Sequence, residues 1–187
     1  KIYENLNTKK ITKLGIALDT KGKEAVNVYT RSDACGAAEM WAKFLNNKKQ
    51  EDIQGIGVNG DPGVADAVKK DINGIGFNNI AYVFDVNTRK KYDGIEVAPI
   101  DINKNGKIDP EEMVYDNLDS IMNAIKDGRY PSPPARDLYF VSHGAPKSAL
   151  VKDFIRWTLT EGQKYVNEAG YVLLPEESIK TELEKIK

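Results

Sequence analysis

Residues 25–45 read AVNVYTRSDACGAAEMWAKFL, a strand-like run, a short polar turn and a helix-like run in direct succession. AVNVYTR (25–31) is rich in β-branched residues, which favours a strand. The run after the turn carries apolar residues at helical spacing, which predicts a helix with one buried stripe. The stripe consists of Ala37, Met40, Trp41, Phe44 and Leu45. A strand followed at once by a helix is the unit from which α/β folds are built.

The same alternation continues outward from this unit. IGV (56–58) predicts a second strand, and Asp61 with Pro62 predicts the cap and first turn of a helix through VADAVKK. Three further runs follow: IGFNNIAYVFD (75–85), mostly buried; GIEVAPI (94–100), strand-like; and NLDSIMNAIKDG (117–128), a helix that ends at Gly128. We therefore predict an α/β fold, with a central mixed β-sheet flanked by helices.

The last third of the chain leaves this pattern at YPSPPARD (130–137). Its three prolines within four positions predict an extended, rigid connector. LYFVSHG (138–144) then reads as a strand, residues 149–170 as one or two helices, and the charged C-terminus as another helix. We expect residues 1–130 to form one lobe and residues 131–187 to leave it.

Composition excludes several classes of function. The chain of 187 residues has 27 basic and 28 acidic residues, so its overall charge favours neither nucleic acid nor an anionic membrane surface as a partner. No apolar run approaches the roughly 20 residues that span a bilayer. Cys35 is the only cysteine, which excludes an internal disulfide framework.

The turn between the first strand and its helix is a candidate anion-binding site. A helix N-terminus has free N–H groups and a positive dipole, and both favour negative charge. The amides of Cys35, Gly36 and Ala37 would donate, Arg31 would add a forked pair, and Asp33 would either cap the helix or accept a proton from the ligand. The alternative is a well-capped helix beside a surface arginine, and from spacing alone we favour that alternative.

A second motif, DINKNGKIDPEE (101–112), has the ligand order of a calcium loop. Calcium takes roughly six to eight oxygen ligands. They would come from Asp101, Asn103, Asn105, the Lys107 carbonyl, Asp109 directly or through water, and a bidentate Glu112. Gly106 permits the sharp bend, and Ile108 is not needed by an ordinary polar turn, which is the alternative interpretation.

This loop lacks the usual helical setting, because a strand-like run precedes it. Calcium sensors work through helix pairs that open. A lone loop between a strand and a helix is more typical of a brace for a long connection. We therefore expect its calcium to be structural.

Neither of the two residues best suited to catalysis has a suitable partner in the sequence. Cys35, at a helix start, could be a reactive thiolate, but no motif places a base beside it. His143 is the only histidine and is expected to be structural, since acid–base catalysis needs a partner within reach. We therefore expect no enzymatic activity.

Several blocks of the chain, in order, resemble the periplasmic phosphate-binding proteins of ABC transporters, in the type II periplasmic-binding-protein superfamily. TRSDACGAAEMWAKFL is similar to the family's RSDGSGTT-type segment, in which a serine, a glycine and a threonine join an arginine in holding phosphate. The other similar blocks are KIYENLNTKKIT (1–12), GVNGDPGVADAV (57–68), GIGFNNIAYVFD (74–85), YPSPPARDLYFVSHGAP (130–146) and DFIRWTLTEGQKYVNEAGYVLLP (153–175).

The resemblance implies a phosphate site on this chain. It makes Arg31 the ligand arginine and puts Cys35, Gly36 and Ala37 in the places of the serine, glycine and threonine. Alanine has no hydroxyl and a thiol is a weak donor, so two side-chain donors of the family are lost while the amides remain. The N-terminal half of the family's first lobe has no counterpart here, so residues 1–130 would be the second lobe and 131–187 the return through the hinge.

The implied function is the substrate-binding component of an ABC importer for phosphate or a related oxyanion. Its partners would be the anion and an ABC permease, with no nucleic acid, and we expect a monomer. It would work in the periplasm or elsewhere outside the cytoplasm, with a lipid anchor possible in the precursor. Because of Cys35 and Ala37, the alternative is an extracytoplasmic anion sensor or a calcium-stabilised interaction domain of the same fold.

Overall fold

The structure is a computed structural model that describes residues 26–46 and 48–186. Its centre is a parallel sheet in the order β2-β1-β3, formed by β1 (Asn27–Arg31), β2 (Ile56–Val58) and β3 (Gly74–Ile75). Tyr29 pairs with Ile56 on one side of β1, and Asn27 pairs with Gly74 on the other. The predicted α/β class is confirmed, and the strands that the structure describes are parallel rather than mixed.

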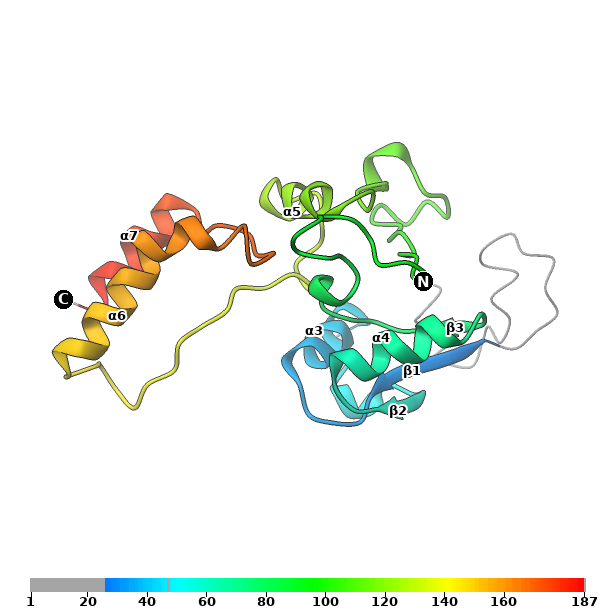
Figure 1. The fold of residues 1–187 in the computed structure, drawn as a ribbon. Coiled ribbons are helices and arrows are strands. Elements are labelled where there is room, and N and C mark those ends of the chain that lie inside the picture. The colour runs from blue at the N-terminus through cyan, green and yellow to red at the C-terminus, as the bar shows by residue number, and fades with distance from the viewer. Residues whose placement is uncertain (1–25, 47, 187) are drawn as a thin grey trace.

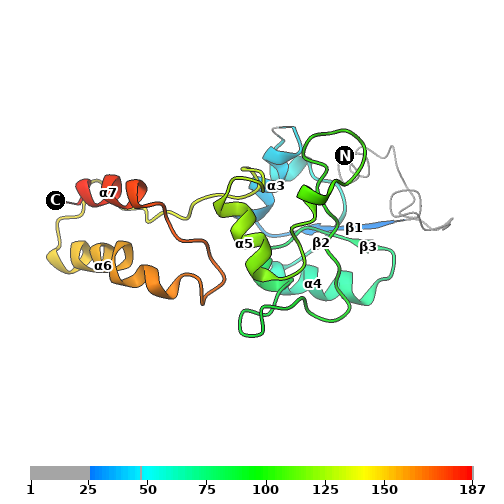
Figure 2. The same ribbon diagram turned by 90° about the horizontal axis from the view of Figure 1, so that it is seen from above.

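Two helices connect the strands and cover the sheet. Helix α3 (Gly36–Phe44) joins β1 to β2, and α4 (Gly60–Lys70) joins β2 to β3. They lie on opposite faces of the sheet (Figure 2). Both helices begin at the carboxyl ends of neighbouring parallel strands, so their N-termini lie at the same edge.

The core on the α3 face consists of Ala38, Ala42, Leu45, Ile53 and Phe77. The buried stripe of this helix therefore begins at Ala38, one residue later than predicted. Ala38 and Ala42 are fully buried, whereas Ala37 and Met40 are only partly buried. Small side chains face the sheet because alanine allows a helix to approach it closely, while Trp41 and Phe44 pack at the rim.

A second core forms around α5 (Leu118–Lys126). Its buried members are Phe84, Val114, Tyr115, Leu118, Ile121, Met122 and Ala124. Asn117 caps the helix by accepting a hydrogen bond from the Ser120 amide at 2.9 Å, and the chain turns away at Gly128, whose φ is +74°. The predicted helix and its end are confirmed.

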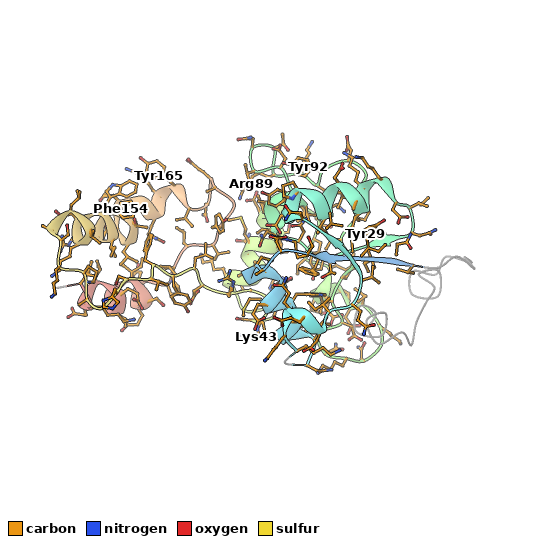
Figure 3. All side chains as sticks on the ribbon, turned by 90° about the horizontal axis from the view of Figure 1, so that it is seen from below. Tyr29, Lys43, Arg89, Tyr92, Phe154 and Tyr165 are labelled. Carbon is orange, nitrogen blue, oxygen red and sulfur yellow. The ribbon has the colours of Figure 1, made fainter. Side chains whose placement is uncertain are left out.

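The C-terminal part consists of α6 (Ala149–Leu159), a 3-10 segment (Glu161–Tyr165) and α7 (Glu176–Glu184). Figure 1 shows α6 and α7 side by side, away from the sheet. Figure 3 labels Phe154 and Tyr165 in this part. The segment that joins α6 to α7 contacts the second core. Val172 packs against this core, and Arg89 donates to the Asn167 carbonyl at 2.9 Å.

Three local predictions are wrong. Residues 94–100 and 138–144 form no strand, because neither run pairs with another strand within the described residues. The apolar side chains of Leu138, Tyr139, Phe140 and Val141 are exposed instead. The connector is not fully extended: it turns at residues 132–134, and the Ala135 amide donates to the Pro131 carbonyl at 3.1 Å.

Two further points concern the ends and the surface of the chain. The segment 1–12, similar to the family's first block, lies outside the described residues. In the part of the chain that the structure describes, no helix combines the length and the hydrophobicity that crossing a bilayer requires.

Candidate functional site

All five residues of the predicted anion site lie between the last residue of β1 and the first turn of α3. Arg31 is the last residue of β1, Cys35 is the N-cap of α3, and Gly36 is the first helical residue. The loop after β2 lies beside it, since the Ser32 amide donates to the Val58 carbonyl at 3.0 Å. The site is therefore built from two loops at one edge of the sheet.

Arg31 is held between two carboxylates. Its Nε donates to Asp33 Oδ1 at 2.8 Å, its Nη2 pairs with Asp33 Oδ2, and its Nη1 donates to Asp61 Oδ1 at 2.5 Å. Its side chain is 8% exposed. A guanidinium has five N–H groups, and three of them are used here. One cation against two anions leaves this cluster with a net negative charge.

Neither Asp33 nor Asp61 is a helix cap. Asp33 does not cap α3, whose N-cap is Cys35. Its Oδ1 instead accepts from the Gly60 amide at 2.9 Å and so ties the two loops together. Asp61 does not cap α4, whose N-cap is Asn59. Instead it binds Arg31 and accepts from Asn79 Nδ2 at 2.5 Å. The sequence signal for this contact was an acid three residues after the second parallel strand.

The ion pair changes the acidity of Asp33. The hydrogen bond from Arg31 lowers the pKa of Asp33 well below its ordinary value, and the bond from the Gly60 amide lowers it further. The same pairing raises the pKa of Arg31. Asp33 is therefore a carboxylate at neutral pH and can accept a hydrogen bond from a protonated oxygen of a ligand.

The helix start is satisfied in part by side chains. Cys35 Sγ accepts from the Ala38 amide at 3.3 Å, which makes Cys35 the N-cap of α3. The Cys35 amide donates to Gln50 Oε1 at 3.1 Å, and Gln50 Nε2 donates to the Asp33 carbonyl at 2.7 Å. The Cys35 amide is therefore taken, which corrects the prediction that it is one of three free donors. The amides of Gly36 and Ala37 have no acceptor among the described residues.

Gly36 makes room for a side chain from a distant part of the chain. A Cβ built on Gly36 would lie 2.3 Å from Nη2 and 3.0 Å from Cζ of Arg136. Arg136 belongs to the proline-rich connector, so this contact joins the connector to the first turn of α3. No sequence signal could have paired these two positions.

A cavity of about 330 Å³ opens beside the loop. It is lined by Arg31, Ser32, Ala34, Gln50, Glu51 and Ile53. The carboxylate of Glu51 adds to the negative charge already present on Asp33 and Asp61. An anion at this edge would therefore need positive charge beyond Arg31.

The predicted calcium loop has a well-ordered set of internal hydrogen bonds. Asp101 accepts from the amides of Asn105 (3.0 Å) and Gly106 (2.9 Å), and the buried Glu112 accepts from the amides of Ile102 (2.6 Å) and Asp109 (3.0 Å). Gly106 has a φ of +86°, as the expected bend requires.

The oxygen ligands of this loop are the hard donors that calcium prefers, so the chemistry of the donor set fits. Their arrangement fits less well, because Asn103 and Asn105 turn their Nδ2 groups, at 2.8 and 2.7 Å, toward Asp109. Within residues 26–46 and 48–186, no three acidic, histidine or cysteine side chains are grouped as a metal site requires.

Comparison with known proteins gives three matches. A model of a PBP superfamily domain matches residues 9–161. The chain is similar to the phosphate-binding protein PstS of Methanocaldococcus jannaschii, with 26% identity over 207 residues, covering 87% of the chain and 51% of the relative. It is also similar to the phosphate-binding protein PstS of Staphylococcus haemolyticus, with 28% identity over 163 residues, covering 87% and 46%. The chain thus spans about half the length of these relatives.

The Arg31–Asp33 pair predicts a specific pH dependence. The folded-state pKa of Asp33 lies below the unfolded value of about 3.9, so the pair stabilises the fold above about pH 4 and this contribution is lost as the pH falls further. We expect Arg31→Met to raise the pKa of Asp33 toward 3.9, measured by NMR titration of its carboxyl carbon. Arg129→Met, which removes an exposed arginine elsewhere, should leave that titration unchanged. An unchanged pKa of Asp33 in the Arg31→Met variant would contradict the assigned pairing.

Proposed function

The chain belongs to the PBP superfamily, and on that premise we propose that it binds inorganic phosphate as the substrate-binding component of an ABC-type importer. The names of the two relatives support phosphate as the ligand, and their name as binding proteins supports a role without catalysis. Such a component works outside the cytoplasm, with a permease as its partner. Because the chain spans about half of each relative, these statements concern the larger protein of which the chain would form one wall.

One observation in the structure carries this proposal. Among the described residues, the amides of Gly36 and Ala37 have no acceptor at the positive end of α3, and they lie beside an arginine that two carboxylates hold in place. Two neighbouring N–H groups at a helix start can bind two oxygens of a tetrahedral anion. The two unused N–H groups of Arg31 are available to the same ligand.

The carboxylates give this site a preference among anions. Asp33 accepts hydrogen bonds but cannot donate them while it is ionised. A phosphate that keeps a proton can donate to such an oxygen, whereas a fully ionised anion such as sulfate would meet repulsion. The negative charge of Asp33 and Asp61 therefore favours a protonated oxyanion.

The C-terminal residues 131–187 would lead to the other wall of the site. The exposed apolar side chains at 138–141 support this, because a contiguous run of exposed large apolar side chains is typical of a surface that contacts another part of the protein. Closure of two walls about the 131–137 connector would then trap the anion.

A second function is favoured by the departures at Cys35 and Ala37. The sulfur of Cys35 caps α3, and Ala37 has no hydroxyl. The site therefore has fewer side-chain donors than the serine and threonine of the family supply. Each lost charge-assisted hydrogen bond weakens binding by about 1.5–3 kcal/mol. A protein that senses an anion, or a calcium-stabilised interaction domain, would tolerate this loss. Neighbouring permease and ATPase genes would favour transport, whereas a fused signalling domain would favour sensing.

We also propose that the loop 101–112 binds calcium as a structural ion. The support is the order of its oxygen ligands, the bend at Gly106 and the buried carboxylate of Glu112. Asp101, Asn103, Asn105, Asp109, Glu112 and the Lys107 carbonyl would hold the ion. Binding would require Asn103 and Asn105 to turn their amide oxygens inward, replacing their bonds to Asp109.

Phosphate binding is tested by titration calorimetry on the complete chain. We expect heat with phosphate that saturates at one anion per chain and weakens as sodium chloride is added, because salt screens the exposed part of the site. Sulfate, molybdate and tungstate serve as comparison anions, and sulfate should bind more weakly. No heat from any of the four would contradict the proposed function.

Calcium binding is tested by thermal unfolding. Added calcium should raise the Tm and a chelator should lower it, since a ligand at 100 times its Kd stabilises the folded state by about 2.7 kcal/mol. Asp101→Ala should abolish this sensitivity, whereas Asp66→Ala, which removes an exposed carboxylate paired with Lys70, should retain it. A wild-type melting curve that responds to neither calcium nor chelator would refute the assignment.

A further inference from the structure

Asn105 and Gly106 form an asparagine–glycine pair at an exposed bend of the loop 101–112. In such a pair, the backbone nitrogen of the glycine can attack the side-chain carbonyl of the asparagine, and the reaction is intramolecular. Glycine leaves this nitrogen unhindered, because it has no Cβ. A Cβ built on Gly106 would have no heavy atom within 4 Å apart from those of its chain neighbours, so the space around the pair is open as well.

The hydrogen bonds of this pair place polar groups at each atom that would react. Oδ1 of Asn105 accepts from the Lys107 amide at 2.8 Å, so an N–H group is in place to stabilise negative charge on that oxygen. Nδ2 of Asn105 donates to Asp109 Oδ2 at 2.7 Å, which puts a carboxylate beside the nitrogen that would leave. The attacking nitrogen, that of Gly106, donates its hydrogen to Asp101 Oδ2 at 2.9 Å.

The two other asparagine–glycine pairs of the sequence, at 59–60 and 73–74, lie in backbone that is held more firmly. Gly60 is the first residue of α4, and its amide donates to Asp33 in the joint between the two loops. Gly74 belongs to β3, and its amide is bonded within the turn that precedes this strand. Attack by either nitrogen would disrupt a helix start or the sheet, whereas attack at residue 106 would move only an exposed loop.

We propose that Asn105 is a deamidation site, at which a neutral amide of the loop 101–112 becomes a carboxylate. The Gly106 nitrogen bonds to Cγ of Asn105 as the bond from Cγ to Nδ2 breaks. The proton of the Gly106 amide passes through water to the departing nitrogen, which leaves as ammonia. Water then adds to one of the two carbonyls of the resulting succinimide ring and opens it, giving aspartate or isoaspartate. Water is the only other reactant.

This modification would change how the loop responds to a cation. Asp109 now accepts from the Nδ2 groups of Asn103 and Asn105. After conversion a carboxylate at residue 105 faces Asp109 instead, and two like charges destabilise the empty loop. Calcium between them offsets this repulsion, and the affinity of such loops depends on the charge of their ligands. The site itself stands on the geometry of the loop, whereas this consequence rests on the calcium binding proposed above.

The site is tested by peptide mass mapping after the complete chain is incubated with a chelator at mildly alkaline pH. The peptide that contains Asn105 should gain the mass of an –OH group in place of –NH2 about 10-fold faster than the peptides with residues 59 and 73, because their backbone must first open. Asn105→Gln, which would have to close a larger ring, should lose this gain, and Asn73→Gln should keep it. Conversion at residue 105 that is no faster than at the other two pairs would overturn the inference.

The consequence is tested with Asn105→Asp, which reproduces the aspartate product. In chelator its Tm should lie below that of the wild type, and calcium should raise its Tm by more than that of the wild type. Asn123→Asp, which adds an acid to an exposed position of α5, should leave the calcium response unchanged. A Tm of Asn105→Asp in chelator at or above the wild-type value would overturn the predicted repulsion. A lower Tm that calcium does not restore would contradict the calcium binding and leave the deamidation site standing.

Discussion

The pairing of Arg31 with Asp33 and Asp61 is the interaction on which the rest of the site depends. It joins the loop after β1 to the start of α4, and Asp33 reinforces the joint through the Gly60 amide. The side chain of Arg31 is nearly inaccessible to solvent, so each carboxylate is needed to offset its desolvation. Removing the arginine would leave two acids facing each other, and removing either acid would leave a charge partly unpaired.

This constraint also determines how an anion can be held. Because Arg31 is paired with two acids, this edge of the sheet is not strongly positive. An unpaired arginine beside a helix start would have made it so. The amides of Gly36 and Ala37, which have no acceptor among the described residues, are the donors that we propose for the anion. In the proposed site, these acids would favour a ligand that still carries a proton.

Sequence reasoning succeeded where structure is decided locally. The strand and helix at 27–44, the second pair at 56–70 and the helix at 118–126 follow from periodicity and caps, and all are confirmed. It failed at 94–100 and 138–144, because a β-prone run becomes a strand only when a neighbour offers hydrogen bonds. The contacts of Asp61, Gln50 and Arg136 were not predicted either, since each joins residues that are far apart in sequence. The shared edge of parallel strands could have suggested Asp61, but nothing in the sequence could have suggested Arg136.

In the proposed site, the start of α3 binds phosphate through the amides of Gly36 and Ala37. The most direct test of this binding is a backbone amide NMR spectrum of the complete chain recorded during a phosphate titration. The account predicts that the resonances of Gly36 and Ala37 move most and saturate together, with smaller changes at Cys35, whose amide is already bonded to Gln50. Saturating changes confined to another part of the chain, or none at all, would contradict it.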